Sequence, residues 1–174
     1  MLFRSSDALA HAVIAANTPG FAAVVRRFGQ SVVSPRGEID RRKLGGIVFA
    51  DPAARRDLEQ IVHPEVQRAT DEWFAGLDGA THPFAIADIP LLYEVNREKD
   101  FDQVIVTACD PAIQLQRVMA RTGLSEWEAR QRLAAQLPID EKARRADYVI
   151  RTEGSLAETD KQVKRVWEML GSRR

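Results

Sequence analysis

Apolar positions show two different patterns of spacing along this chain, and the change from one pattern to the other predicts where helices and strands lie. Before residue 84, apolar side chains recur every three or four residues, which is typical of amphipathic helices. After it, short apolar runs at 84–89, 103–108 and 148–151 alternate with helical patterns. Strands that alternate with helices indicate a parallel α/β sheet buried on both faces. We therefore expect three parallel strands, and none before residue 84. A sheet this small suggests that strands are missing or are supplied by another chain.

Capping and breaking residues predict the ends of the helices. Proline at position 52 is typical of a first helical residue, and Gly29 and Gly123 are typical of helix ends. Ser125 and Glu128 have the spacing of a capping box. The expected helices cover about residues 6–14, 19–28, 40–49, 51–62 with a continuation over 65–77, 112–122, 125–136, 140–146 and an amphipathic stretch after residue 155.

The first predicted strand ends in a group of residues suited to a functional edge. Asp88, Pro90 and Glu94 lie at or just beyond the end of the apolar run FAIADIPLLYE, residues 84–94. In open α/β sheets, ligands bind beyond the carboxyl ends of the strands. The alternative is that the two acids only cap and solvate the strand end.

Composition excludes several classes of function. The 174 residues carry 25 basic and 25 acidic side chains, so no net charge favours nucleic acid or a membrane surface. No apolar run is long enough to span a bilayer, and the N-terminal residues do not resemble a signal peptide. The single Cys109 rules out an internal disulfide framework and is typical of a reducing, cytoplasmic compartment. Its apolar surroundings predict a buried, inert thiol.

Arginine is concentrated in the second half of the chain. Arg117 and Arg121 stand four residues apart and therefore share one helix face, and further basic residues flank the next loop: Arg130, Arg132, Lys142, Arg144 and Arg145. Arginine forks bind phosphate oxygens and stabilise a phosphoryl transition state. The alternative is a solvated surface on which these cations pair with neighbouring acids such as Glu126 and Glu141.

A series of motifs gives the chain a recognisable pattern. In order, they are SDALAHAV, TPGFAAVVRRFG, GEIDRRKLGGIVFADPAARRDLEQIVHPEV, DIPLLYE, QLQRVMARTGLSEWEARQRLAAQ and ADYVIRTEGSL. In this order the motifs resemble the dephospho-coenzyme A kinase family, from about residue 6 to the last helix. The combination of HPEV, DIPLLYE and the arginine-flanked segment is highly specific. Another nucleoside or nucleotide kinase with the same general fold is the competing assignment, and HPEV with DIPLLYE argues against it.

The resemblance implies a fold and a reaction. The fold is α/β, of the P-loop NTPase type, with a three-layer parallel sheet, a helical substrate domain and a lid. It implies one domain over residues 1–174, with a helical coenzyme A-binding part at about 18–80, a core at 84–122 and 147–174, and a lid at 123–146. The reaction moves the γ-phosphoryl group of ATP, supplied with Mg²⁺, to the ribose 3′-hydroxyl of dephospho-coenzyme A.

The resemblance also implies roles for individual residues. Asp7 matches the second acid of an Asp-x-Asp motif and is implied to be the general base on the ribose hydroxyl. His11 stands where the family usually has a substrate-holding arginine, and His63 matches a His-Pro whose role is either substrate binding or structural. Substrate binding is also expected of Pro90 and Glu94. The expected ATP and lid phosphate contacts are Arg117, Arg121, Arg132 and Gln136, and no residue is expected to be a dedicated metal ligand.

The chain departs from the family pattern near its start. The family has a glycine-rich loop ending in Gly-Lys-Ser/Thr that holds the ATP phosphates, and no such motif occurs in these residues. Ser5 replaces the first acid of Asp-x-Asp. We therefore expect an N-terminally truncated kinase that lacks the first two strands, binds ATP poorly and has little activity. The alternative is a non-catalytic protein that binds coenzyme A or a partner.

Overall fold

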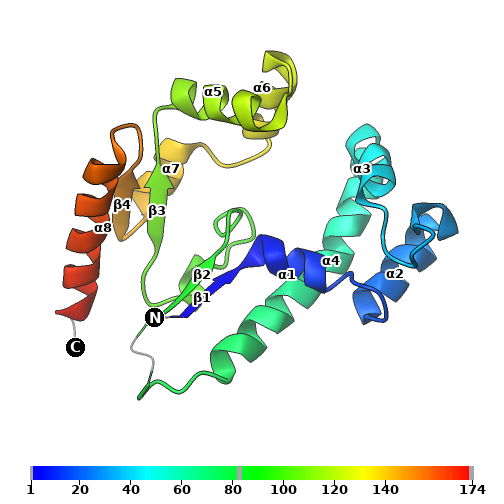
Figure 1. Ribbon diagram of the computed structural model, residues 1–174, viewed down its shortest axis with the longest axis horizontal. Helices are drawn as coiled ribbons and strands as arrows, with labels where there is room; N and C mark the ends of the chain where they lie inside the picture. The colour runs from blue at the N-terminus through cyan, green and yellow to red at the C-terminus, as the bar shows by residue number, and fades with distance from the viewer. Residues whose placement is uncertain (1, 82–83, 173–174) are drawn as a thin grey trace. The chain divides into compact units, whose positions relative to one another are not determined.

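Two parallel strand pairs organise the computed structural model of the chain, which describes residues 2–81 and 84–172 (Figure 1). Strand β1 (Leu2–Ser5) pairs with β2 (Ala85–Asp88), and β3 (Ile105–Ala108) pairs with β4 (Tyr148–Arg151). The chain divides into two units, Met1–Pro90 and Leu91–Arg174, and each unit contains one strand pair. The α/β class and the parallel pairing expected from the sequence are confirmed.

The strand predictions needed two corrections. The expectation of helices alone before residue 84 was wrong, because Leu2–Ser5 form β1. This strand has only four residues and includes Arg4 and Ser5, so it shows no apolar run. The expected burial of the first predicted strand on both faces was also wrong. Asp88 is exposed and the rest of β2 is half-buried, since in the described residues β2 is hydrogen-bonded to β1 alone.

Unit 1 is mainly helical. Its core consists of Val24, Val32 and Leu44, against which Phe28 and Leu58 pack. Most helix bounds lie within two residues of those expected, because prolines and capping side chains mark them. The elements are α1 (Ser6–Ala12), α2 (Pro19–Phe28), the 3₁₀ turn η1 (Gln30–Val32), α3 (Arg41–Ala50) and α4 (Pro52–Ala75).

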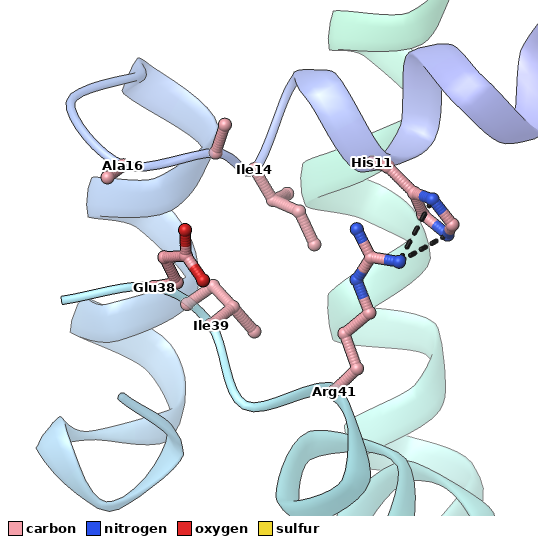
Figure 2. A pocket seen from close by; sticks show the side chains of 7 residues that line it. His11, Ile14, Ala16, Glu38, Ile39 and Arg41 are labelled. Atoms are coloured by element: carbon pink, nitrogen blue, oxygen red, sulfur yellow. Dashed lines mark hydrogen bonds between the residues drawn. The ribbon is translucent and has the colours of Figure 1, made fainter. Parts of the chain in front are cut away.

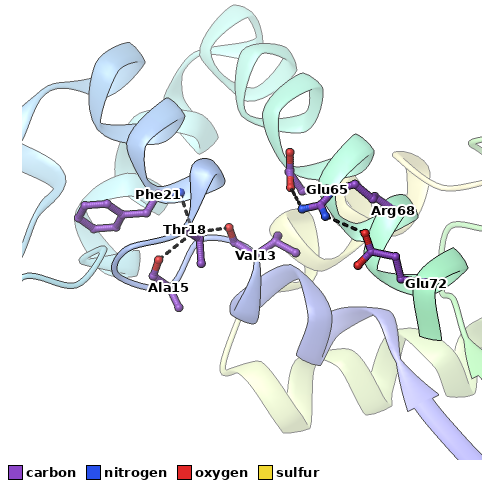
Figure 3. Close-up of polar contacts among 7 residues, drawn as sticks. All are labelled: Val13, Ala15, Thr18, Phe21, Glu65, Arg68 and Glu72. Carbon is purple, nitrogen blue, oxygen red and sulfur yellow. Dashed lines mark hydrogen bonds and ion pairs between the residues drawn. The ribbon is translucent and has the colours of Figure 1, made fainter. Parts of the chain in front are cut away.

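Hydrogen bonds of the Thr18 side chain connect α1 to α2 (Figure 3). The Thr18 hydroxyl lies 2.7 Å from the carbonyl oxygen of Val13 and 2.8 Å from that of Ala15, and it accepts a 3.0 Å hydrogen bond from the amide of Phe21. Gly20 packs closely beside it, since a Cβ atom there would lie only 2.2 Å from the Val13 oxygen. The turn therefore depends on a small residue at position 20 and on the threonine hydroxyl.

Helix α4 runs unbroken through Pro64 over its 24 residues. A proline inside a helix removes one backbone hydrogen bond and favours a kink. The turns after it carry compensating contacts: Arg68 pairs with Glu65 at 2.7 Å and with Glu72 at 2.8 Å (Figure 3). The predicted continuation beyond His63-Pro64 is therefore confirmed.

Unit 2 contains the β3–β4 pair and helices whose ends follow the sequence signals. Gly123 ends α5 in the left-handed conformation, with φ of 69°. Capping boxes open α6 at Ser125 and α8 at Ser155. The elements are η2 (Glu98–Asp100), α5 (Pro111–Thr122), α6 (Glu126–Ala134), α7 (Ile139–Arg145) and α8 (Leu156–Gly171). The buried core includes Tyr93, Val106 and Ala108.

Two predictions about single side chains had different outcomes. Cys109 is buried, as its apolar surroundings predicted. Helix α8 buries Val166, but Leu156 on the same predicted apolar face is 85% exposed. Amphipathic spacing therefore located α8 correctly without showing how much of its apolar face is covered.

Candidate functional site

The register of the first strand pair brings two candidate acids to one edge. Ser5 is paired with Asp88 at the carboxyl ends of β1 and β2. Asp7 follows Ser5 by two residues and lies in the first turn of α1. Both acids are exposed. The parallel pairing therefore places Asp7 and Asp88 at the edge where open α/β sheets bind ligands.

A cavity of about 420 Å³ lies in unit 1, between the end of α1 and the start of α3 (Figure 2). Its lining consists of His11, Ile14, Ala15, Ala16, Glu38, Ile39 and Arg41. The isoleucines provide an apolar surface, whereas Glu38 and Arg41 bring opposite charges. This mixture suits a ligand that has both charged and apolar parts.

Arg41 and His11, which both line the cavity, are in direct contact with each other (Figure 2). The Nη1 atom of Arg41 lies 3.0 Å from Nδ1 and 3.1 Å from Nε2 of His11. Asp40 fixes the start of α3 by accepting hydrogen bonds from the amides of Arg42 and Lys43. This cap sets Arg41 as the first residue of the helix.

From the sequence, His11 was expected in a substrate site, whereas Arg41 was not selected. The signal that could have found it is local: Asp40 is a strong N-cap residue, and the arginine after it starts a helix beside a turn. Nothing in the spacing shows that this arginine meets a histidine 30 residues earlier. That contact depends on the packing of α3 in unit 1.

Three other predicted site residues of unit 1, namely Asp7, His63 and Pro90, lie outside this cavity. Asp7 is exposed on α1 and does not line the cavity. His63 is exposed in the middle of α4 and does not line it either. The structure therefore brings His11, but not His63, together with the other residues of the cavity. Pro90 is exposed in the turn that follows β2.

Glu94 makes contacts inside unit 2. Its Oε1 atom lies 2.7 Å from Nζ of Lys142 and accepts a 2.8 Å hydrogen bond from the amide of Leu137. Burial by itself raises the pKa of Glu94, but the hydrogen bonds from Lys142 and the Leu137 amide outweigh it, so this pKa lies below its ordinary value. Glu94 thus anchors the segment between α6 and α7.

Most arginines of the predicted lid and its flanks have partners. The ion pairs are Arg130 with Glu126, Arg144 with Glu141 and Arg145 with Glu98. Arg117 donates two hydrogen bonds to Thr152, one to the hydroxyl at 3.0 Å and one to the backbone carbonyl at 2.6 Å. For Arg130 and Arg144, the prediction of a solvated surface on which arginines pair with neighbouring acids is confirmed, whereas Arg145 pairs with the distant, half-buried Glu98.

Arg121 and Arg132 differ from these neighbours. Both are exposed, and neither forms an ion pair or side-chain hydrogen bond with any other described residue. Gln136 is half-buried just beyond α6, where its backbone N–H donates to the Leu133 carbonyl at 3.0 Å. The guanidinium groups of Arg121, at the end of α5, and of Arg132, in the predicted lid segment, are therefore available to an anionic ligand.

Neither a metal centre nor a membrane-spanning helix is found in the part of the chain that the structure describes. No group of three or more His, Cys, Asp or Glu residues among residues 2–81 and 84–172 is arranged to hold a metal ion. No helix in these residues is both long and apolar enough to cross a membrane.

Comparison with known proteins decides the family. The dephospho-CoA kinase family profile (CoaE) matches residues 4–158. The dephospho-CoA kinase of Anaeromyxobacter dehalogenans is 49% identical over 150 residues, covering 86% of this chain and 71% of that protein. The chain belongs to the dephospho-CoA kinase family. The dephospho-CoA kinase of Symbiobacterium thermophilum is 45% identical over 162 residues, covering 93% of this chain and 68% of the relative.

Solved structures agree with this assignment. The dephospho-CoA kinase from Campylobacter jejuni superposes with a TM-score of 0.71 at 28% identity, covering all of this chain and 87% of its own. A Thermus thermophilus protein gives a TM-score of 0.77 at 35% identity, with 97% and 84% covered. The P-loop kinase fold is therefore confirmed. Dephospho-CoA kinases are phosphotransferases that catalyse the last step of coenzyme A biosynthesis, with ATP as a substrate.

Proposed function

We propose that this chain holds dephospho-CoA at the carboxyl edge of the β1–β2 pair, with the ribose 3′-hydroxyl against Asp7. The observation that carries this proposal is the register that pairs Ser5 with Asp88 and sets Asp7 at that edge. An exposed carboxylate can accept the hydroxyl proton within hydrogen-bond reach. The ribose oxygen then bonds to the γ-phosphorus of Mg·ATP, the bond to the bridging oxygen breaks, and ADP leaves.

Arg121 and Arg132 are the residues that we assign to the transferred phosphates. Phosphoryl transfer depends on positioning and on neutralising the charge of the phosphoryl oxygens. Their exposed guanidinium groups, which have no partners among the described residues, suit this role better than the paired ones. Arg117 and Gln136 complete the proposed phosphate contacts. Arg117 would act from the position that its hydrogen bonds to Thr152 hold.

The remaining assignments rest on the family resemblance. His11 is proposed as a substrate contact, and its place in the cavity supports this role. His63, Pro90 and Glu94 stay predictions of substrate binding, as does the division into a helical part at 18–80, a core and a lid at 123–146. We propose a cytoplasmic location and small-molecule ligands only, without nucleic acid or membrane partners, in line with the zero net charge and the single cysteine.

A second candidate function concerns only the 174 residues printed, among which no Gly-x-x-x-x-Gly-Lys-Ser/Thr motif occurs. Backbone amides of such a loop hold the ATP phosphates. We expect the 174-residue polypeptide by itself to bind Mg·ATP weakly, with turnover well below the roughly 1–100 per second of kinases. In that case it acts as a binding protein for dephospho-CoA or coenzyme A.

Calorimetric titration with dephospho-CoA and, separately, with Mg·ATP tests both functions, together with a turnover assay. We expect dephospho-CoA to bind. Turnover at a normal kinase rate would disprove the binding-only function, and failure to bind dephospho-CoA would disprove both. Asp7→Asn should retain dephospho-CoA binding and lose any turnover. Asp160→Asn, an exposed change on α8, is the matched control and should alter neither.

A further inference from the structure

The cavity between α1 and α3 contains a cation that the proposed mechanism does not use. Arg41 is exposed, and it forms no ion pair with any acid among residues 2–81 and 84–172. Its Nη1 group contacts the His11 ring, so that Nη2 and Nε remain free of described protein partners. A guanidinium group presents its donors in a planar fork that matches phosphate oxygens. His11 therefore holds the Arg41 guanidinium group in place at Nη1, while Nη2 and Nε can donate hydrogen bonds to a ligand.

The spacing of Asp7 and His11 relates this cation to the proposed base. Residues four apart lie on the same helix face, about 6 Å along the axis at 1.5 Å per residue. Asp7 and His11 have this spacing within α1. A ribose whose 3′-hydroxyl meets Asp7 carries its 5′-substituent on the far side of the sugar ring. That substituent would therefore lie about one helical turn away, where His11 meets Arg41.

We propose that Arg41, steadied by His11, binds the 5′-diphosphate of dephospho-CoA; this inference rests on the proposed function. The cavity of about 420 Å³ has room for part of the chain attached to the diphosphate, and Ile14 and Ile39 give it an apolar surface. Arg41 is thus a substrate-binding residue that sets the position of the ribose relative to Asp7.

The other charged group of the cavity limits the affinity for a free anion. Glu38 lines the same space, and its carboxylate forms no ion pair within the described residues. Its negative charge opposes that of a phosphate, so a bare anion binds more weakly than a molecule that also fills the apolar part. The Glu38 carboxylate can accept a hydrogen bond from an amide or hydroxyl of the attached chain.

Titration of the full chain with dephospho-CoA, inorganic pyrophosphate and adenosine tests the proposal. Arg41→Gln should weaken dephospho-CoA binding about 10- to 100-fold, the cost of losing a charge-assisted hydrogen bond of about 1.5–3 kcal/mol. It should abolish pyrophosphate binding and leave adenosine binding unchanged. Arg41→Lys, which keeps the charge without the fork, should lie between wild type and Arg41→Gln. Arg42→Gln, its exposed neighbour, is the control and should behave as wild type.

A second readout follows the site directly in the wild-type chain. Pyrophosphate should shift the NMR resonances of the His11 ring and leave those of His63 unchanged, since His63 does not line the cavity. Circular dichroism and thermal unfolding of Arg41→Gln should match wild type, because the side chain is exposed.

The possible outcomes separate this inference from the proposed function. Wild-type affinity for dephospho-CoA in Arg41→Gln would overturn the inference and leave the function standing. Arg41-dependent pyrophosphate binding without dephospho-CoA binding would show an anion site and overturn its assignment to this substrate. Binding of neither compound by wild type would overturn both.

Discussion

The Glu94 carboxylate and the Lys142 ammonium group form an ion pair at 2.7 Å that is largely withdrawn from solvent, with side-chain exposures of 19% and 10%. The same carboxylate oxygen accepts a 2.8 Å hydrogen bond from the backbone amide of Leu137. Removing one member of a buried pair usually costs much, because the other member loses the opposite charge with which it was paired. The pair joins the turn after residue 90 to the segment between α6 and α7.

Glu94→Gln should destabilise the chain at pH 7 by about 3 kcal/mol, at the lower end of the range for breaking a buried ion pair. The reason is that Lys142 keeps its charge while the opposing carboxylate is lost. The measurement is the free energy of unfolding from urea denaturation, followed by circular dichroism.

The control for this variant is Glu126→Gln, which breaks the exposed pair with Arg130. Exposed pairs contribute about 0–1 kcal/mol, so this variant should remain close to wild type. The double change Glu94→Leu with Lys142→Met should recover much of the stability, because it leaves no unpaired charge. Equal losses in Glu94→Gln and Glu126→Gln would contradict the importance of the buried pair.

The stability that Glu94 provides should depend on pH in a defined direction. Its pKa is lower in the folded chain, so the unfolded chain binds the proton more readily and acid favours unfolding. The contribution is fully present above the unfolded glutamate pKa of about 4.3 and is lost as the pH falls through the lower folded pKa. The stability difference between wild type and Glu94→Gln should therefore shrink below about pH 4.3. A constant difference in urea unfolding from pH 7 to pH 3 would exclude this origin.

Gly20→Ala should destabilise unit 1, because the new Cβ atom would lie 2.2 Å from the Val13 carbonyl oxygen. Relieving that overlap means moving backbone, and overpacking typically costs about 1–3 kcal/mol. Gly46→Ala in α3 is the matched control, since a Cβ atom there meets nothing within 4 Å. Alanine is the better helix former, so this control should gain up to about 1 kcal/mol. Thermal unfolding of the two variants should show shifts of opposite sign.

Thr18→Ala should cost about 1–2 kcal/mol, the effect of losing an N-cap side chain. The hydroxyl also donates to the carbonyl oxygens of Val13 and Ala15 in the turn between α1 and α2. The loss of stability should therefore lie in the upper part of this range. Thr18→Ser keeps the hydroxyl and should stay within about 0.5 kcal/mol of wild type, as changes that break no special contact usually do. Urea denaturation compares the three proteins, and similar losses in both variants would show that the hydroxyl is not responsible.

Arg121→Gln and Arg132→Gln should each reduce the binding of Mg·ATP, or any measurable phosphoryl transfer, by about 10-fold or more. Arg130→Gln should have little effect, because Arg130 is occupied by Glu126 in the same helix. Calorimetric titration and a coupled assay at equal ionic strength provide the comparison. An equal effect of all three changes would indicate a general electrostatic contribution rather than specific phosphate contacts.

The local features of this protein follow from its sequence alone. Prolines, caps and glycines at positions such as Thr18, Pro52, Gly123 and Ser125 located the helices, because each acts within a few residues of backbone. The motif order also identified the family. Strand β1 escaped prediction, since a four-residue strand containing Arg4 gives no periodic signal and exists through its hydrogen bonds to β2.

Tertiary structure decided which charged residues have partners. Spacing gives both Arg130 and Arg132 an acid four residues earlier, but only Arg130 forms the ion pair, with Glu126 at 2.7 Å. The carboxylate of Glu128 instead accepts hydrogen bonds from the amide and hydroxyl of Ser125. The sequence assigned Glu94 to substrate binding without the Lys142 contact 48 residues away. Arg41 was not selected until packing set it against His11. Sequence spacing reports what lies within one turn of a helix, whereas the pairing of distant charges depends on how the elements pack.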